Sequence, residues 1–319
     1  MTRFYGKAGG TAVALLFCSD AADAALLDFC AALDPGLISV FAVLSQPPEG
    51  ELDFPFPLFV EREGKVRQAY RLEAGQHTTL FVLDPNLRLL KTLDLQDPQA
   101  AVQEVLATLA ADLPAIAPQP LTAQAPVLLI PRVLDPEICR HLIQVWEEQG
   151  HEETGVEQSH QGRREGILDH TDKRRLDHVV QDPDLQQALS STIARRILPE
   201  VHRAFAFRAT RFEGFKVACY DAAAQGFFRA HRDNLSPSTA HRRFALTLNL
   251  NTDYEGGCLE FPEYGPHLYR PEAGAALVFS CAHLHAVTAV THGRRFALLS
   301  FLFGEENTRP STAPEKKTP

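Results

Sequence analysis

The sequence contains no apolar run long enough to span a bilayer. Its longest runs, residues 11–17 and 125–130, are far shorter than the roughly 18 apolar residues that a membrane-spanning helix needs. An excess of positive charge is also missing, because 31 Lys and Arg residues face 40 Asp and Glu residues and the net charge is −9. We therefore expect neither a membrane nor a nucleic acid as a partner of the whole protein.

Cysteines are few and widely spaced. The chain has six, and no two of them form a CxxC pair, which excludes a zinc ribbon and a dithiol redox motif. Cys219 and Cys281 lie within apolar runs, where buried and reduced thiols are the simplest interpretation. Reduced thiols are typical of a cytoplasmic protein, and we expect this location. The apolar residues 11–17, which follow Arg3 and Lys7, are predicted to form a first strand rather than a leader peptide.

The pattern along the 319 residues predicts two globular domains. In residues 1–112, strand-like and helix-like segments alternate, which indicates an α/β domain. Residues 113–125 are rich in proline and are predicted to form an extended linker. Residues 126–304 begin with helical patterns and continue as short strands, which favours a sandwich or barrel. The polar tail, residues 305–319, is expected to be disordered.

Three segments of the second domain carry more specific expectations. Residues 151–169 are polar and contain glycine, so a loop is predicted, and residues 184–207 are predicted to form one amphipathic helix. The basic clusters at 163–164 and 173–175 ordinarily mark a solvated face. The alternative is that residues 151–177 form a lid that faces the substrate, because long loops are often functional.

Two His-x-Asp motifs are candidates for a metal site. A mononuclear non-haem Fe(II) centre uses two His and one carboxylate on one face of the metal and leaves the other positions open. Residues i and i+2 of a strand point to the same side, so His-x-Asp at a strand end can supply two ligands. His170 and Asp172 lie in a charged stretch, whereas His231 and Asp233 lie between two strand-like segments. We therefore favour His231 and Asp233.

Three further residues stand at the ends of apolar segments around this motif. His285 lies 54 residues after His231, at the end of the strand-like GAALVFSC, and is the candidate for the second imidazole. Arg295 follows ten residues later and starts the strand-like RRFALLSFLF. Tyr220 precedes His231 by eleven residues and ends the segment FKVACY.

The segments VACYDAAAQGFFRAHRDN, TLNLNTDYEGGCLEFPEYG and AGAALVFSCAHLHAVTAVTHGRRFALLSFLF resemble the Fe(II)/2-oxoglutarate dioxygenases, in particular the prolyl-4-hydroxylase-like group. Four elements occur in the family's order: a Tyr, HxD, a hairpin with two glycines, and HxVxxVxxGxR. The resemblance covers about residues 126–304. It implies a double-stranded β-helix, or jelly roll, with Fe(II) as cofactor and 2-oxoglutarate and O2 as co-substrates.

The same resemblance implies roles for individual residues. His231, Asp233 and His285 match the iron ligands, and no catalytic residue beyond the metal centre is implied. Arg295 matches the basic residue that pairs with the distal carboxylate of 2-oxoglutarate, a task suited to a planar guanidinium. Tyr220 and Asn249 complete the expected co-substrate pocket. Asn249 stands where many relatives have a second Tyr, so its amide is expected to bind the same carboxylate.

Other interpretations of these residues stay open. His283 competes with His285 as the ligand, although its spacing to the following Val and Gly residues does not fit the motif. Arg294 competes with Arg295 but points to the opposite face of the strand. His241 is either a charged strand entry or a substrate contact, and Tyr220 alternatively is an ordinary core aromatic. The two glycines at residues 256–257 are most simply explained by a tight turn that needs positive φ.

Residues 5–112 resemble the peroxiredoxin branch of the thioredoxin fold, through the opening strand and helix and through HTTLFVLDPNLRLLKTLD at residues 77–94. A peroxiredoxin needs a reactive thiolate at the start of the helix that follows the first strand. Residues 19–22 read SDAA there, Cys18 comes too early and Cys30 too late. The implied domain is redox-inactive and serves packing, recruitment or dimerisation.

These observations together predict an α+β fold with a thioredoxin-like domain followed by a jelly roll with supporting helices. The resemblance implies hydroxylation of a C–H bond, with a prolyl residue in a protein or peptide as the first candidate. A small-molecule hydroxylase is the nearest alternative. A non-catalytic metal-binding scaffold or sensor and a thiol peroxidase based on the first domain are the others.

Overall fold

The computed structural model describes residues 8–18, 24–48, 54–72, 78–113, 120–160 and 163–305, with Phe4 and Ala117. The chain divides into two compact units, Met1–Gln119 and Pro120–Pro319, and their boundary falls inside the predicted linker. The finer domain bounds stay a prediction. The SDAA turn and the tail beyond Glu305 lie outside the described residues. Within the described ranges no helix is both long and apolar enough to cross a bilayer.

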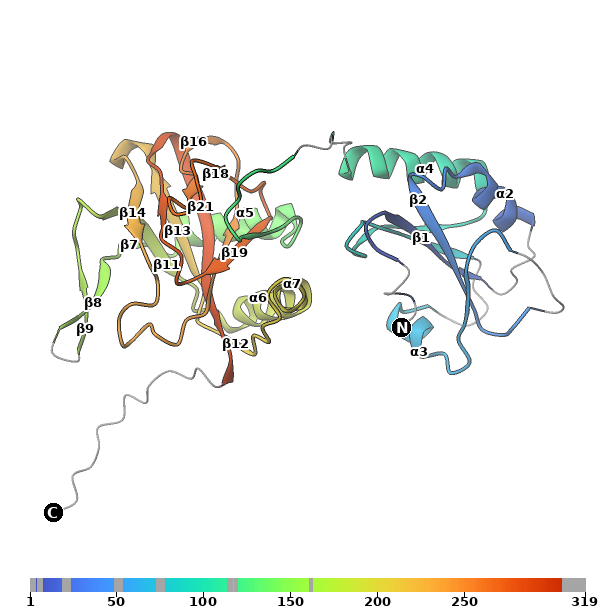
Figure 1. The fold of residues 1–319 in the computed structure, drawn as a ribbon, viewed down its shortest axis with the longest axis horizontal. Helices are drawn as coiled ribbons and strands as arrows, with labels where there is room; N and C mark the ends of the chain where they lie inside the picture. Colours follow the sequence, from blue (N-terminus) through green and yellow to red (C-terminus); the bar gives the residue numbers. More distant parts are fainter. Residues whose placement is uncertain are drawn as a thin grey trace, which may run out of the picture. The chain divides into compact units, whose positions relative to one another are not determined.

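The first unit is a five-stranded sheet with helices (Figure 1). Its elements are β1 Ala12–Cys18, α2 Ala24–Ala32, β2 Ile38–Leu44, β3 Leu58–Val60, α3 Lys65–Ala69, β4 Thr79–Leu83, β5 Leu89–Asp94 and α4 Pro98–Asp112. The strand order is β3-β2-β1-β4-β5, in which β1, β2 and β3 run parallel and β4 and β5 are antiparallel to their neighbours. The thioredoxin-like assignment of this unit stays a prediction.

Alternate residues of the first strand serve two hydrophobic layers. Ala14 and Leu16 pack into a cluster with α2 and α4, whereas Leu15 and Phe17 pack into a second cluster with aromatic side chains of β2 and β4. A strand that is buried on both faces reads as the continuous apolar run seen in the sequence. The expectation of a first strand is confirmed.

The second unit contains sixteen strands and three α-helices in its described part (Figure 1). The helices are α5 Pro136–Glu148, α6 Pro183–Arg196 and α7 Leu198–Phe205, with a short 3-10 helix η1 at Ala222–Ala224. The strands are β6 Leu128–Ile130, β7 Glu152–Glu153, β8 Val156–His160, β9 Arg163–Ile167, β10 Lys173–Arg174, β11 Leu176–Val179, β12 Arg211–Phe212, β13 Lys216–Asp221, β14 Phe227–His231, β15 Phe244–Asn249, β16 Tyr254–Gly256, β17 Leu259–Glu260, β18 Leu268–Tyr269, β19 Ala276–Ser280, β20 His285–Val287 and β21 Val290–Phe303.

These strands form two main antiparallel sheets. The larger has nine strands, with the path β6-β19-β15-β21-β13-β11-β7 and with β12 and β16 also paired to β21. The smaller has the order β10-β14-β20-β17-β18. The described chain is therefore a mixed α/β protein with many antiparallel strands, in keeping with the predicted jelly roll.

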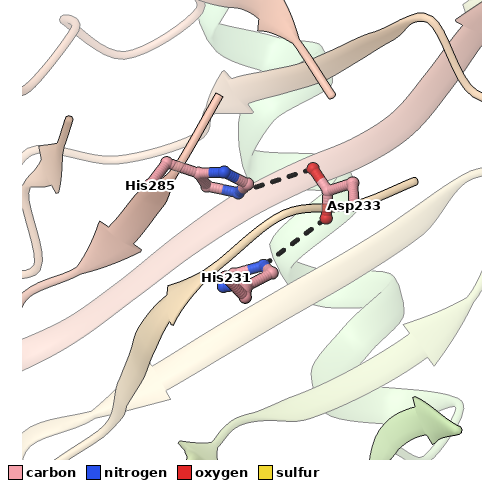
Figure 2. A group of neighbouring side chains, drawn as sticks. All are labelled: His231, Asp233 and His285. Atoms are coloured by element: carbon pink, nitrogen blue, oxygen red, sulfur yellow. Dashed lines mark ion pairs between the residues drawn. The ribbon is translucent and has the colours of Figure 1, made fainter. Parts of the chain in front are cut away.

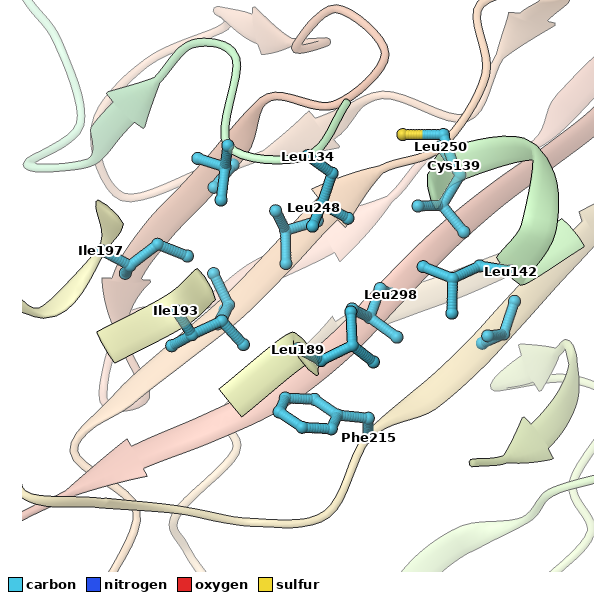
Figure 3. Packing of buried hydrophobic residues seen from close by; sticks show 14 of the residues in the cluster. Leu134, Cys139, Leu142, Leu189, Ile193, Ile197, Phe215, Leu248, Leu250 and Leu298 are labelled. Carbon is cyan, nitrogen blue, oxygen red and sulfur yellow. The ribbon is translucent and has the colours of Figure 1, made fainter. Parts of the chain in front are cut away.

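The helices of the second unit cover one face of the larger sheet (Figure 3). Leu142 of α5 and Leu189 and Ile193 of α6 pack against Leu248 of β15 and Leu298 of β21. Two of these helices begin with Asp-Pro, which favours a helix start because Pro fits the first turn and Asp can cap it. In α6 the cap is formed, since the Asp182 carboxylate accepts a hydrogen bond from the Leu185 N–H at 2.7 Å.

The other face of the larger sheet looks toward the smaller sheet. Along β13, Val217 and Cys219 belong to the helix-side core, whereas Ala218 and Tyr220 pack with Leu259 of β17 on the opposite side. This alternation follows from the two-residue period of a strand. It places every second side chain of β13, β15 and β21 in the space between the sheets.

Two expectations about the second unit were wrong. Residues 151–169 are not a loop throughout, because β7 joins the larger sheet and β8 pairs with β9 as a two-stranded hairpin. Residues 184–207 are not one helix, because α6 ends at Arg196 and α7 begins at Leu198. Pro199 lies in the first turn of α7, and a proline has no N–H to continue the preceding helix.

Candidate metal centre

Three side chains that are distant in sequence meet at the end of the smaller sheet (Figure 2). His231 is the last residue of β14 and lies directly opposite His285, the first residue of β20, in the antiparallel pair. Asp233 follows β14 by two residues, and its backbone N–H donates to the Cys281 carbonyl at 3.0 Å. The strand pairing therefore brings the two imidazoles and the carboxylate together.

The facing atoms of this group are close enough for one metal ion. The Asp233 Oδ1 atom lies 3.4 Å from His231 Nε2, and its Oδ2 atom lies 3.4 Å from His285 Nε2. One potential ligand atom from each residue lies within 4.8 Å of the other two. No other set of three or more His, Cys, Asp or Glu side chains meets this criterion in the ranges that the structure describes.

Both imidazoles are oriented by backbone carbonyls. The Nδ1 atom of His231 is 2.7 Å from the Arg229 carbonyl, and the Nδ1 atom of His285 is 3.0 Å from the His283 carbonyl. Since a carbonyl can only accept, each Nδ1 carries the hydrogen and each Nε2 keeps its lone pair. This is the arrangement that orients metal-binding histidines, and it fits an Fe(II) ion held by two Nε2 atoms and a carboxylate.

The ionisation states also suit a divalent cation. Burial opposes ionisation of Asp233, but the neighbouring His285 and His231 outweigh it and keep the pKa of this carboxyl below its usual value. Burial lowers the pKa of His285, although Asp233 opposes that shift. Near neutral pH the site therefore offers a carboxylate and a neutral buried imidazole, the forms that bind a metal.

An ion pair between Arg232 and Glu263 lies beside the segments that carry Asp233 and His285. The guanidinium of Arg232, between the His and Asp of the motif, donates to both Glu263 carboxylate oxygens, at 2.6 and 3.1 Å. Arg232 also donates to the Ala282 carbonyl, and Glu263 accepts the Leu284 N–H at 2.9 Å. These contacts hold the segment before His285 beside the segment that ends in Asp233.

A cavity of about 920 Å³ opens between the two sheets beside this group. His231, Asp233 and His285 lie on its wall from the smaller sheet. The larger sheet contributes Tyr220 and Arg295, which are directly opposite each other in the β13–β21 pair. Five of the six predicted site residues therefore line one cavity, and Asn249 is the exception.

Arg295 is a buried cation in this cavity, with 2% of its surface exposed. Its Nε atom donates to Asn249 Oδ1 at 3.4 Å, and its Cζ atom lies 5.3 Å from the centre of the Tyr220 ring. The Nδ2 atom of Asn249 donates to the carbonyls of Asn251 and Pro271, at 2.8 and 2.9 Å. Asn249 therefore holds Arg295 and uses its own donors on the backbone, rather than pointing them into the cavity.

Thr247 is a cavity residue that the sequence analysis missed. It lies two residues before Asn249 on β15, is 5% exposed and lines the cavity. Its Oγ1 atom is buried and has no hydrogen-bond partner among the residues that the structure describes. A buried hydroxyl without a partner is unfavourable, and a bound carboxylate would accept its hydrogen. Thr247 and Arg295 together therefore fit the carboxylate of a bound acid such as 2-oxoglutarate.

Thr247→Val is expected to raise stability and weaken 2-oxoglutarate binding at the same time. Removing an unsatisfied buried hydroxyl relieves about 1 kcal/mol, whereas losing a ligand hydrogen bond raises the Kd about 3- to 10-fold. Thermal unfolding and calorimetric titration of the iron-loaded protein measure the two effects. Thr108→Val is the control, because the Thr108 hydroxyl donates to the Glu104 carbonyl at 2.7 Å and its loss should only destabilise. An unchanged Kd in Thr247→Val would remove Thr247 from the site.

The two glycines of the hairpin make room for this site. Gly256 and Gly257 have φ values of +72° and +58°, which confirms the expected turn. A Cβ atom on Gly257 would lie 2.8 Å from Val290 Cγ2 and 3.0 Å from Arg295 Cδ. Because Gly257 has no side chain, the aliphatic part of the Arg295 side chain can occupy this position without a clash.

Gly257→Ala is expected to lower the free energy of unfolding by about 1–3 kcal/mol, because it strains a left-handed backbone and crowds Arg295. It should also weaken 2-oxoglutarate binding, since the guanidinium is displaced. Denaturant unfolding and ligand titration measure both. Gly64→Ala is the matched control, with φ +67° and nothing within 4 Å of the added Cβ, so only stability should change. Equal effects of both variants on ligand binding would contradict the contact with Arg295.

The competing candidates lie elsewhere. Arg294 points to the opposite face and donates to Glu147 of α5 at 2.8 Å. His283 contacts the Tyr264 ring, with 5.1 Å between ring centres, and is not part of the three-residue group. The Nε2 atom of His241 donates to Glu213 Oε1 at 2.8 Å, and His241 is not on the cavity wall. His170 lies 3.0 Å from Glu153 near the surface.

The segment considered as a lid contributes four residues to the cavity wall. They are Thr154, Gly155, Lys173 and Arg175. The predicted solvated face is wrong for two of them, because Lys173 is 6% exposed and the Arg175 side chain is 11% exposed. The side chains of the β8–β9 hairpin, which include the cluster at 163–164, lie outside the described residues.

Comparison with known proteins identifies relatives of this region. Residues 215–303 match the 2OG-Fe(II) oxygenase superfamily. A PKHD-type hydroxylase of Psychrobacter sp. strain PRwf-1 is 32% identical over 84 residues, which cover 26% of this chain and 32% of that protein. A PKHD-type hydroxylase of Synechococcus sp. strain JA-2-3B'a(2-13) is 25% identical over 130 residues, which cover 39% of this chain and 55% of that protein. This chain thus spans only about a third to a half of these relatives.

Solved structures with a similar region include two prolyl hydroxylases. The Trichoplax adhaerens enzyme, in complex with a hypoxia inducible factor peptide fragment, is 17% identical with a TM-score of 0.47, over 58% of this chain and 86% of that one. A Pseudomonas putida prolyl-4-hydroxylase is 18% identical with a TM-score of 0.43, over 57% of this chain and 94% of that one.

The family match covers β13 to β21 and includes His231, Asp233, His285 and Arg295. The family implies Fe(II), 2-oxoglutarate and O2, and the geometry of the three-residue group fits the iron. Residues 215–303 of the second unit are therefore similar to the 2OG-Fe(II) oxygenase superfamily.

Proposed function

We propose that the protein is a Fe(II)- and 2-oxoglutarate-dependent dioxygenase that hydroxylates a C–H bond. The observation that carries the proposal is the convergence of His231, Asp233 and His285, with both Nε2 atoms facing the Asp233 carboxylate, on a cavity that also holds the buried cation Arg295. In this proposal the three residues bind the iron. Arg295 and Thr247 bind the distal carboxylate of 2-oxoglutarate.

Iron, 2-oxoglutarate and O2 would supply the oxidising chemistry, and the protein residues would position the reactants. Arg295 suits its role because, among the described residues, its hydrogen-bond partner is the neutral amide oxygen of Asn249 and not a carboxylate. The aromatic side chains Phe228 and Phe279 flank the two histidines, with ring-centre distances of 3.6 Å to His231 and 4.6 Å to His285. An apolar surround of this kind limits access of water to the metal.

The first candidate substrate is a prolyl residue in a protein or peptide. Support comes from the resemblance of the HxD and HxVxxVxxGxR motifs to prolyl-4-hydroxylase-like enzymes and from the hydroxylase names of the relatives. The cavity wall also includes apolar side chains at its exposed rim, Leu235 at 76% and Val179 at 43% exposure. These could contact a peptide chain. A small-molecule substrate is the alternative.

For the first unit we propose a thioredoxin-like fold without redox activity. The parallel β1–β2 pair, connected through α2, and the antiparallel β4–β5 pair support the fold. Burial raises the pKa of Cys30 to about 12, so its thiol is not ionised at neutral pH. Cys18 is buried within β1 rather than at a helix start. Both positions argue against a thiol peroxidase.

The test is anaerobic loading of the full chain with Fe(II) and 2-oxoglutarate, followed by O2 and a screen of peptides and metabolites. Succinate formation that depends on both iron and 2-oxoglutarate, coupled to addition of one oxygen atom to a substrate, is the expected result. A hydroxylated proline residue in a peptide product supports the first candidate. A hydroxylated metabolite supports the alternative. Metal binding without any succinate would instead identify a non-catalytic scaffold.

A further inference from the structure

A buried charged cluster borders the cavity beside Tyr220. Lys173 and Arg175 are two positions apart in an extended segment, so both side chains take the same face. Both line the cavity. Arg174 between them instead donates to the backbone carbonyls of His170 and Ala224, at 3.3 and 3.2 Å. The basic run therefore places two of its three cations at the site.

Arg175 is held rigidly by a carboxylate. Its Nε and Nη2 atoms donate to the two oxygens of Asp177, at 2.6 and 2.7 Å. The Asp177 side chain is fully buried and accepts a further hydrogen bond from Thr154 Oγ1 at 2.6 Å. Lys173 Nζ donates to the same Thr154 oxygen at 2.7 Å. This bidentate pair uses one side of the guanidinium and leaves Nη1 to make other contacts.

The remaining side of Arg175 meets Tyr220. Its Nη1 atom donates to the Tyr220 hydroxyl at 3.3 Å, and its Cζ atom lies 5.8 Å from the ring centre. Arg295 approaches the same ring at 5.3 Å, so Tyr220 lies within reach of two guanidinium groups. A phenol oxygen that accepts a hydrogen bond still has its own hydrogen to donate. Tyr220 lines the cavity and is only 2% exposed. Bulk water therefore competes little for that hydrogen, and a ligand in the cavity can accept it.

We infer that Arg175 is a positioning residue for 2-oxoglutarate, which acts by holding the Tyr220 hydroxyl so that its hydrogen is donated into the cavity. The inference rests on the proposed function, because it requires that the co-substrate binds beside Tyr220. The Asp177 carboxylate balances the charge of Arg175, so this support adds no unpaired charge to the cavity wall. A side chain locked by neighbouring hydrogen bonds is the means by which proteins hold such a group in place.

The experiment is a double-mutant cycle on 2-oxoglutarate affinity. The full chain is loaded with Fe(II) without oxygen, and the Kd for 2-oxoglutarate is measured by calorimetry for Tyr220→Phe, Arg175→Lys and the two combined. Each single variant should raise the Kd about 3- to 10-fold, as for the loss of one hydrogen bond. The combined variant should show no further loss, because Arg175 acts through the hydroxyl that Tyr220→Phe has already removed.

Two comparisons separate positioning from damage to the fold. Arg174→Lys, the same exchange on the neighbouring residue, should leave the Kd unchanged. Arg175→Met combined with Asp177→Leu replaces the ion pair by apolar groups of similar size, a change that buried pairs often tolerate. This variant should fold, keep its Fe(II) affinity and still show the weaker 2-oxoglutarate binding. It provides the test if Arg175→Lys does not fold.

The outcomes separate a failure of the proposed function from a failure of this inference alone. If the unmodified protein binds no 2-oxoglutarate, the proposed function and this inference both fail. If it binds 2-oxoglutarate and the Arg175 variants bind it equally well, only the inference fails. Additive losses in the combined variant would also overturn the inference, because Arg175 would then act independently of Tyr220.

Discussion

Replacing His285 or His231 by Ala is expected to abolish Fe(II) binding and 2-oxoglutarate turnover. Each variant removes one of only three protein ligands, and each leaves Asp233 without one of the two imidazoles that lie 3.4 Å from its oxygens. The loss should exceed the roughly 10- to 100-fold that is typical when a residue behind a metal ligand is changed. Anaerobic Fe(II) titration and succinate formation measure it.

The second His-x-Asp motif provides a matched control for this prediction. His170 is also the histidine of a His-x-Asp motif, but it lies outside the three-residue group and 3.0 Å from Glu153. His170→Ala is therefore the control variant. We expect its iron affinity to match that of the unmodified protein. If His283→Ala lost iron binding and His285→Ala kept it, His283 would be the ligand and our assignment would be refuted.

Replacing Arg295 by Ala is expected to raise the Kd for 2-oxoglutarate about 10- to 150-fold for each charged hydrogen bond that is lost. The reason is that Arg295 is a buried cation on the cavity wall, so a bound carboxylate would lose its counter-charge in a region shielded from water. Fe(II) affinity should change little. Titration of the iron-loaded variant with 2-oxoglutarate measures the effect, and circular dichroism checks its fold.

Arg294→Ala is the control for Arg295→Ala. Its guanidinium pairs with Glu147 on the helix side of the larger sheet, at 2.8 Å, and both side chains are about half exposed, at 44% and 45%. An exposed ion pair of this kind contributes little to stability, and its loss should leave 2-oxoglutarate binding intact. The reverse result would mean that our assignment of the pocket cation is wrong by one residue.

Much of the architecture could be predicted because it follows from local patterns. The apolar run of residues 11–17 indicated a first strand, and the Asp-Pro pairs before α4, α5 and α6 are local signals that favour helix starts. The split between α6 and α7 was missed, although Pro199 carried the signal, because the apolar spacing continues across the break.

The hairpin of β8 and β9 was also missed. Its strands, VEQSH and RREGI, are mostly polar and show no apolar alternation in the sequence. The same reasoning explains why residues 173–175 looked like a solvated run. Alternation along an extended segment buries two of the three cations. Their burial is favourable because Arg175 pairs with Asp177 and because Lys173 donates to Thr154 and Gly155.

The sequence by itself determined the chemical identity and order of the candidate site: an imidazole and a carboxylate at one strand end, a second imidazole 54 residues later, and an arginine ten residues beyond it. The tertiary structure alone decided which hydrogen bonds those groups and their neighbours make. Asn249 turns its donors to backbone carbonyls, Thr247 keeps a hydroxyl without a partner among the described residues, and Arg175 reaches Tyr220. The physical reason is that burial and hydrogen bonding depend on which distant strands become neighbours, and a local pattern does not contain that information.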